Sequence, residues 1–427
     1  MSRIASVALL VALVAAACGD AFSNNDGASG RDGAADAASE GQLDARPVDA
    51  PIPVTVSGKV YAPEGTIPIF GALVYAVVSD PAPIPDKVFC DRCVELPQGT
   101  PNTRSSHDGA FELKLTPGTW KLVTQKGAFR RVREIVVPPA GLAVDPAITT
   151  LPQKTDATKG DTIPKMVVIQ GAWDAIESSL AKLGLGQVDA NGSLVAGSET
   201  FTLYRCTLTQ LLPPVVDCKP RPPQDMLKDY ALLSQYQILF LPCDSEWLDG
   251  VIADPTVKAN LLRWIREGGR LYATDYQYDQ IRTLLPDYIT WQGQSGVAGS
   301  AELDSAYDAP AVVNDPDMKQ WLAAQGVTTF DLQQSWTIID SVHKVPTPSF
   351  DGKTYDVTPT VWVSGAVPGV GVKPATVSFP YGCGRVLFSS YHTEGAKSQG
   401  KSLLPQEKAL LYVTLEVAVC LTLPKVN

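Results

Sequence analysis

The first eighteen residues constrain this 427-residue chain more than any later feature, because they decide the compartment in which the rest folds. Arg3 stands near the start, an apolar run extends from Ile4 to Val14, and three alanines precede Cys18. A positive start, an apolar stretch of about 7–15 residues and small residues before a cleavage point are typical of a secretory signal. We therefore expect the following residues to fold outside the cytoplasm, where thiols form disulfides.

The cysteine that ends this segment resembles the lipidated cysteine of bacterial lipoproteins. Such signals are cut directly before a cysteine whose sulfur carries diacylglycerol. The resemblance implies a signal peptide of residues 1–17, a palmitate-bearing lipid on Cys18 and a membrane anchor in the cell envelope. Ala15 stands where these signals usually carry Leu, so an ordinary signal cut after Ala17 is the alternative. Gly19 follows the cysteine, which favours the outer membrane by the enterobacterial sorting rule.

Residues 18–52 predict a disordered acidic tether. Between Gly19 and Ala50 the chain is mostly Ser, Asn, Gly, Ala and Asp, with Phe22 as its only aromatic residue. Seven acids and two arginines give this stretch a charge of −5, half of the chain's formal −10. Such a composition cannot bury enough apolar surface to fold, so we expect a solvated spacer between lipid and folded domains.

Composition limits the partners of the folded remainder. Its length suggests two or three domains. A net negative charge without a basic cluster makes nucleic acid an unsuitable partner, and no G-x-x-x-x-G-K-[ST] sequence for a nucleotide occurs. The apolar stretch from Leu403 to Leu423 contains Glu407, Lys408 and Glu416, so it predicts a buried helix and not a membrane span.

Residues 53–152 predict a small antiparallel β-sandwich. Val54, Val56, Gly58 and Val60 alternate with polar residues, which is the period of two of a half-buried strand. Further strands are expected at 71–78, 110–115, 119–123 and 131–137, separated by turn residues such as those at 108–109 and 117–118.

The order of these strands resembles the carboxypeptidase regulatory-like domain, a transthyretin-like sandwich. The matching residues are those at 56–60, 71–74, 108–111 and 117–120. The resemblance implies an accessory module without catalytic residues. Some relatives of this fold bind glycans, so Trp120 and Tyr75 are candidates for a sugar platform. Core packing of both rings is the simpler expectation.

Residues 163–427 predict an α/β domain. Buried strands are expected at 165–171, 236–242, 270–275 and 384–391, and helices at 172–183, 256–267 and 405–420. This alternation favours a largely parallel sheet with helices on both faces, as in flavodoxin-like folds. In such sheets, ligands bind where the strands end at their carboxyl edge.

Polar residues stand at these strand ends, and they resemble the class I glutamine amidotransferase-like superfamily. Tyr391-His392-Thr393-Glu394 matches the late His-x-Glu of that superfamily, and the residues at 268–273 match the approach to its nucleophilic cysteine. The whole order resembles bacterial lipoproteins that join a carboxypeptidase regulatory-like domain to a domain of this type. The resemblance therefore implies a flavodoxin-like shape and a site at His392.

The nucleophile of that superfamily is missing here. Thr274-Asp275-Tyr276 stands where the cysteine is expected, so the triad is incomplete and a non-catalytic role is favoured. Many members of the superfamily have lost the triad and serve as binding or scaffold domains. The alternative is a hydrolase or amidase that uses His392 and Glu394 with Cys243 or Asp275.

Acids and aromatic rings near the expected strand ends suggest a ligand site. The carboxylates among them could together hold a hard cation such as calcium, but no loop has the spacing of an EF-hand, so we expect solvated carboxylates and no metal. No cofactor is expected either. A sugar is the favoured ligand, since rings stack on sugars and carboxylates accept hydroxyl hydrogen bonds. The candidate ligand-binding residues are Asp244, Glu246, Asp275, Tyr276, Tyr278, Asp279, His392 and Glu394.

Seven cysteines remain after Cys18, so one is left unpaired. The predicted disulfides are Cys90–Cys93, Cys206–Cys218 and Cys383–Cys420, which leave Cys243 as a free thiol. Exchange of Cys243 with Cys206 or Cys218 is the alternative. A zinc or redox role for Cys90 and Cys93 is the alternative to the first pair. Altogether, the sequence predicts an envelope lipoprotein with a binding or scaffolding role, whose partners are the membrane, through the lipid, and a glycan or envelope protein. Neither nucleotide nor nucleic acid is expected.

Overall fold

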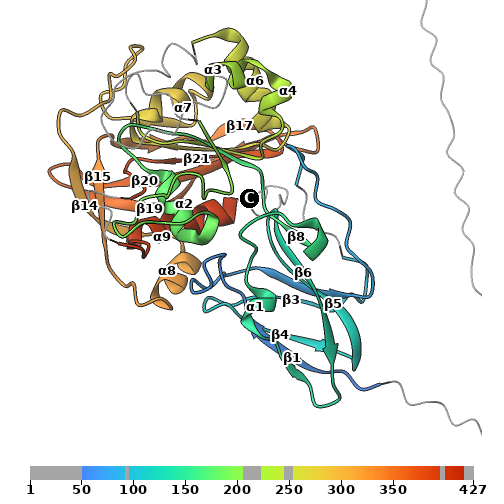
Figure 1. Cartoon of the computed structure of the whole chain (residues 1–427). Coiled ribbons are helices and arrows are strands. Elements are labelled where there is room, and N and C mark those ends of the chain that lie inside the picture. The colour runs from blue at the N-terminus through green and yellow to red at the C-terminus, as the bar shows by residue number, and fades with distance from the viewer. Residues whose placement is uncertain (1–50, 92–95, 205–222, 245–252, 395–399, 418–427) are drawn as a thin grey trace, which may run out of the picture. The chain divides into compact units, whose positions relative to one another are not determined.

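The computed structural model describes residues 51–91, 96–204, 223–244, 253–394 and 400–417 (Figure 1). These residues belong to one compact unit, Pro51–Asn427. Cys18 and the tether up to residue 50 lie outside the described residues. Among the described helices, none is long and apolar enough to cross a membrane.

Two small sheets form from residues 54–162. One has the strand order β4-β1-β7 and the other the order β3-β2-β5-β6-β8, and all pairs are antiparallel except β1 with β7. The strands are β1 (Val54–Lys59), β2 (Leu73–Val77), β3 (Asn102–Arg104), β4 (Ala110–Leu115), β5 (Gly118–Lys126), β6 (Phe129–Val137), β7 (Leu142–Ala143) and β8 (Asp161–Thr162), with helix α1 (Pro146–Thr149) and the 3-10 turn η1 (Ala157–Lys159). Their packing as a sandwich remains a prediction from the sequence.

Alternation along the strands places their apolar side chains in the interior. In β4, Phe111, Leu113 and Leu115 are buried, whereas Glu112 and Lys114 are exposed. Tyr75 of β2 is only 3% exposed, so it packs in the core and offers no sugar platform. Trp120 is half-buried, and its indole N–H donates to the carbonyl of Thr116.

A nine-stranded sheet dominates the rest of the chain. Its order is β10-β9-β11-β12-β21-β20-β19-β14-β15. The first five strands are parallel to one another, and in chain order they read 2-1-3-4-5, the order of flavodoxin-like sheets. The strands are β9 (Met166–Ile169), β10 (Thr202–Tyr204), β11 (Ile238–Leu241), β12 (Arg270–Thr274), β14 (Tyr307–Val313), β15 (Asp331–Ser335), β19 (Thr360–Val367), β20 (Gly371–Tyr381) and β21 (Gly384–Ser389).

The other half of this sheet is antiparallel, and the sequence did not predict it. β20 contains Pro374 and Pro380, and β14 contains Pro310, which are residues that normally indicate loops or sheet edges. Two further strand pairs, β13 (Ile289–Trp291) with β16 (Ile339–Val342) and β17 (Val345–Pro348) with β18 (Thr354–Val357), are also antiparallel. The expected largely parallel sheet is therefore a mixed sheet.

Helices cover both faces of the parallel half, as the sequence predicts (Figure 1). Val167 of β9 belongs to one hydrophobic cluster and Val168 to the other, because neighbouring residues of a strand point to opposite faces. The first face carries α3 (Pro223–Lys228), α4 (Tyr230–Leu233), α6 (Pro255–Arg266), the 3-10 turn η3 (Asp275–Gln277) and α7 (Tyr278–Leu284); the second carries α2 (Ile176–Leu180), the π-helical turn η2 (Ala181–Leu185), α8 (Pro316–Ala323) and α9 (Pro405–Val417).

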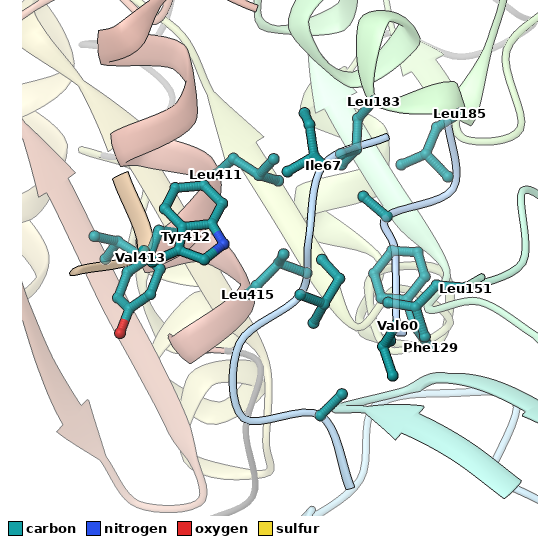
Figure 2. Packing of buried hydrophobic residues seen from close by; sticks show 14 of the residues in the cluster. Val60, Ile67, Phe129, Leu151, Leu183, Leu185, Leu411, Tyr412, Val413 and Leu415 are labelled. Atoms are coloured by element: carbon teal, nitrogen blue, oxygen red, sulfur yellow. The ribbon is translucent and has the colours of Figure 1, made fainter. Parts of the chain in front are cut away.

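The second cluster continues from this sheet into the small sheets. Figure 2 shows Leu411 and Leu415 of α9 and Leu183 of η2 near Val60 and Phe129 of the β-rich part. The indole N–H of Trp321 in α8 also donates to the carbonyl of Pro68, 2.6 Å away. The two predicted domains therefore share one core.

A disulfide joins Cys90 to Cys383, 293 residues apart. The predicted pairings Cys90–Cys93 and Cys383–Cys420 are therefore wrong, whereas Cys206 and Cys218, like Cys93 and Cys420, lie outside the described residues. The cause is a long-range contact that the sequence does not reveal. The segment carrying Cys90 crosses to the start of β12, where a Cβ on Gly268 would lie 1.9 Å from the carbonyl oxygen of Phe89.

Candidate functional site

Four parallel strands bring titratable residues together at their carboxyl edge. Asp174 follows β9, Cys243 follows β11, Asp275 follows β12 and His392 follows β21. All four are at most 4% exposed. The edge where flavodoxin-like sheets bind ligands is thus lined by the protein's own charged and polar groups.

Asp275 occupies the sharp turn at which the resemblance places the missing nucleophile. Its φ of 49° lies in the left-handed region, which non-glycine residues seldom adopt. Its carboxylate accepts hydrogen bonds from the backbone N–H of Trp336, at 3.1 and 3.2 Å, and from the hydroxyl of Thr337, at 3.0 Å. The turn therefore presents a buried, hydrogen-bonded carboxylate.

His392 lies against this carboxylate, with Nε2 3.3 Å from Oδ2 of Asp275. Burial raises the pKa of Asp275 to about 6, although the histidine acts in the opposite direction. Burial also disfavours the charged imidazole, but the adjacent carboxylate of Asp275 and the charge of Asp174 outweigh it and raise the pKa of His392. The pKa values of both groups are therefore raised in the folded protein.

Cys243 completes what we call the Asp275 cluster: Asp275, His392 and Cys243. One side-chain ligand atom of each lies within 4.8 Å of the others. Burial raises the pKa of the Cys243 thiol well above its usual range, and the neighbouring charges of Asp275 and Asp174 raise it further. Cys243 thus forms no disulfide in the structure, as predicted. Its side chain is only 1% exposed, and its surroundings strongly disfavour the ionised thiolate.

Asp174 ties three strand ends together. Its carboxylate accepts from the hydroxyl of Thr274 at 2.8 Å, and from the backbone N–H and hydroxyl of Thr393 at 2.9 and 3.1 Å. The hydroxyl of Thr274 in turn accepts from the backbone N–H of Cys243. These donors fix the carboxylate of Asp174 in place, so that it covers this part of the carboxyl edge of the sheet.

A second buried group, which we call the Glu407 cluster, consists of Glu407, Lys182 and Ser179. Lys182 and Glu407 form an ion pair at 2.9 Å, and both side chains are 0% exposed. The hydroxyl of Ser179 and the backbone N–H of Leu404 each donate to the carboxylate at 2.6 Å. The positive charge of Lys182 thus balances the negative charge of Glu407, and the carboxylate of Glu407 has hydrogen-bond donors around it.

Glu394 lies in the field of these acids. Burial raises its pKa to about 8, and the charges of Asp174, Glu177 and Glu407 add to the shift. Glu394 is therefore largely protonated at neutral pH.

The remaining predicted ligand residues have partners of their own. Tyr278 is fully buried and accepts from the backbone N–H of Ala301, so a role in stacking on a sugar is incompatible with this structure. Asp279 pairs with Arg282 at 2.6 Å. The hydroxyl of half-buried Tyr276 donates to the carbonyl of Leu303.

Asp244 is 8% exposed, and its carbonyl accepts from the side chain of Gln277. Glu246 lies outside the described residues. The structure thus brings Asp275, His392 and Cys243 together, whereas Tyr278 and Asp279 serve the packing of α7.

Sequence reasoning missed Asp174, Glu177, Lys182 and Glu407. Asp174 and Glu177 follow the first parallel strand, so the rule that selected Cys243 and His392 would have found them at the same edge. No comparable signal exists for Lys182 and Glu407. They stand 225 residues apart, and a charged residue in a helix is normally solvated.

An open groove of about 570 Å³ lies elsewhere, between the small sheets and the start of β11. Arg130 of β6 is 9% exposed and contributes to its wall. Its Nη1 donates to the carbonyl of Ala82, but Nε is buried without a hydrogen-bond partner among the described residues. The lining residues are Asp80, Pro81, Pro83, Ile84, Pro85, Asp86, Lys121, Arg130, Val132, Glu134, Thr155, Ala157, Thr158, Lys159, Gly160, Thr162, Ile163 and Gln237.

Comparisons with known proteins leave the family open. No family profile and no curated protein matches the chain. Among solved structures, it is similar to a ThuA-like protein from Parabacteroides merdae, with 12% identity over 61% of this chain and 93% of that one and a TM-score of 0.33. It is also similar to PurLQS from Thermotoga maritima, with 10% identity over 60% and 99% of the two chains and a TM-score of 0.31.

A third similarity involves a catalytic mutant of the GH42 β-galactosidase Gan42B from G. stearothermophilus. The identity is 9%, the coverage is 61% of this chain but only 30% of the galactosidase, and the TM-score is 0.30. At these TM-scores, the assignment of a flavodoxin-like sheet rests on the strand order of the chain itself.

Proposed function

We propose that this chain is a lipid-anchored protein of the cell envelope with a non-catalytic binding role, and that it holds a carboxylate-bearing ligand in the groove beside Arg130. Acidic glycans and peptidoglycan fragments belong to this ligand class. The observation that carries the proposal is the buried Arg130, which contributes to the wall of a large groove and whose Nε has no hydrogen-bond partner among the described residues.

A buried guanidinium without a carboxylate is unfavourable, because its desolvation is not compensated. The other cations of the groove wall have acids beside them: Lys121 lies 2.7 Å from Asp80, and Lys159 lies 3.6 Å from Asp156. For Arg130, no ion pair occurs within the described part of the chain. A ligand carboxylate would supply the missing acceptor, since arginine pairs well with planar carboxylates.

The carboxyl edge of the sheet supports the non-catalytic part of the proposal. A nucleophile must be exposed to its substrate and activated. Cys243 is 1% exposed with a raised pKa, and Asp275 is 0% exposed. The hydrolase alternative would require both properties at one of these residues.

Binding to immobilised oligosaccharides and soluble peptidoglycan fragments tests the proposal, with acidic and neutral members of each set compared. The full chain in detergent is expected to bind the acidic members, and Arg130→Gln to lose at least tenfold in affinity while the fold is kept. Arg263→Gln, an exposed arginine paired with Glu267 on α6, is the matched control. Equal binding of acidic and neutral ligands, or unchanged binding by Arg130→Gln, would overturn the proposal.

A further inference from the structure

Three different ligand types meet in the Asp275 cluster. A thiol, a carboxylate and an imidazole come from the ends of three neighbouring strands, β11, β12 and β21, and their ligand atoms lie within 4.8 Å of one another. All three side chains are buried. Sulfur, nitrogen and oxygen ligands of this kind are those that Zn²⁺ uses in proteins.

A poorly satisfied nitrogen points to an absent ligand. Nε2 of His392 is buried and makes no well-formed hydrogen bond among the described residues; Oδ2 of Asp275 lies 3.3 Å away, at the distance of an ion pair. A buried polar atom without a partner is costly and calls for an explanation. A metal ion bound between the two groups would accept the lone pair of the neutral imidazole.

The surrounding hydrogen bonds hold two of the three ligands in position. The backbone carbonyl of His392 accepts from the side chain of Gln406 at 2.7 Å, and the backbone N–H of His392 donates to the carbonyl of Gln334. The carboxylate of Asp275 accepts from Trp336 and Thr337, and lone pairs remain for a further partner. Such outer partners orient metal ligands in known sites.

The charge around the thiol favours a cation. The acids whose charges act on the thiol are Asp275, Asp174 and Asp244. The same negative charges attract a divalent ion, and coordination lets the thiol ionise.

We propose that Cys243, Asp275 and His392 bind Zn²⁺. The ion takes the thiolate sulfur, one carboxylate oxygen and an imidazole nitrogen, and a water completes a tetrahedral set. One proton leaves the Cys243 thiol to solvent on binding, and any proton held by the His392–Asp275 pair leaves with it, so that the imidazole is neutral and the carboxylate ionised in the complex. Ligand atoms of such a site stand roughly 3.5 Å apart, so separations of up to 4.8 Å shorten by roughly 1.3 Å at most.

This site is separate from the groove at Arg130, so either proposal can fail without the other. Chelator-treated full chain in detergent is titrated with Co²⁺, and then loaded with Zn²⁺ for X-ray absorption at the zinc edge. The expected results are one equivalent of cobalt with a thiolate-to-cobalt charge-transfer band, and one sulfur neighbour of zinc at about 2.3 Å. Bound zinc with only nitrogen and oxygen neighbours, or no uptake of either metal, would overturn the proposal. This test needs only the unmutated protein.

Variants assign the ligands. Cys243→Ser is expected to abolish the charge-transfer band, and His392→Gln to weaken zinc binding at least tenfold. His343→Gln is the matched control. The ring of His343 is exposed and contacts Thr290 and Ser341, which do not belong to the Asp275 cluster. Circular dichroism checks the fold of each variant. A band of unchanged intensity in folded Cys243→Ser would exclude Cys243 as a ligand.

Discussion

The Glu407 cluster and the Asp275 cluster are both buried and charged, yet they differ in how completely they are satisfied. Glu407 receives donors from Lys182, Ser179 and Leu404, and one cation balances one anion. In the Asp275 cluster, a buried nitrogen makes no well-formed hydrogen bond among the described residues, and the pKa values of Asp275 and His392 are both raised. The first arrangement is structural, whereas the second depends on pH and on what binds to it.

The largest effect is expected when the satisfied pair is broken. Lys182→Met leaves Glu407 buried without its cation, which costs about 3–5 kcal/mol in the free energy of unfolding. Lys165→Met is the control, because its pair with Asp86 is exposed and such pairs contribute about 0–1 kcal/mol. Urea denaturation of both variants measures the difference. Similar costs for the two would show that the Glu407 cluster is not buried as described.

A smaller, pH-dependent effect is expected at Glu394. The folded state holds the proton of this carboxyl more tightly than the unfolded chain does, because its pKa is raised to about 8. Stability from this group is therefore present at acid pH and is lost as the pH rises from the ordinary value of 4.5 to about 8. Glu394→Gln should be neutral at pH 5 and stabilising at pH 9, on the order of 2 kcal/mol.

Glu267 gives a control of opposite sign. Burial acts to raise its pKa, but hydrogen bonds from Tyr230 and Arg263 prevail and lower it. Its stabilising contribution is thus present at neutral pH and lost on acidification, so Glu267→Gln should destabilise at pH 9 and not at low pH. Denaturation curves in the presence of a chelator compare the two variants. Equal behaviour of both would contradict the burial of Glu394.

The parallel half of the sheet was predictable because its strands are continuous apolar runs such as that of β11, and its helices have clear apolar faces. The carboxyl-edge rule then selected Cys243, Asp275 and His392 before their contacts were visible. The pattern gave no comparable information on β14, β19 and β20, since prolines interrupt β14 and β20 and all three strands pair with antiparallel partners.

Long-range pairs account for the other failures. Cys90 and Cys383 are 293 residues apart, and their pairing follows from the packing of a proline-rich loop against β12, which periodicity does not encode. Asp279 was expected to bind ligand, but Arg282 stands one helical turn away and pairs with it. Local patterns therefore identified strands and their ends, while partners across the fold decided what each polar residue does.

The smallest effect is expected at the thiol of the unsatisfied cluster. Native full chain should be labelled by iodoacetamide at Cys243 only slowly at every pH from 6 to 9, since burial and neighbouring acids keep the sulfur protonated. Peptide mass spectrometry measures the rate, with urea-unfolded protein as the accessible reference. His392→Ala should leave this slow rate unchanged, because the histidine does not activate a thiol that stays protonated. Rapid labelling below the ordinary pKa of cysteine, abolished in His392→Ala, would instead make Cys243 an activated nucleophile. The Asp275 cluster would then be the active site of a hydrolase, and its unsatisfied histidine would be a catalytic base.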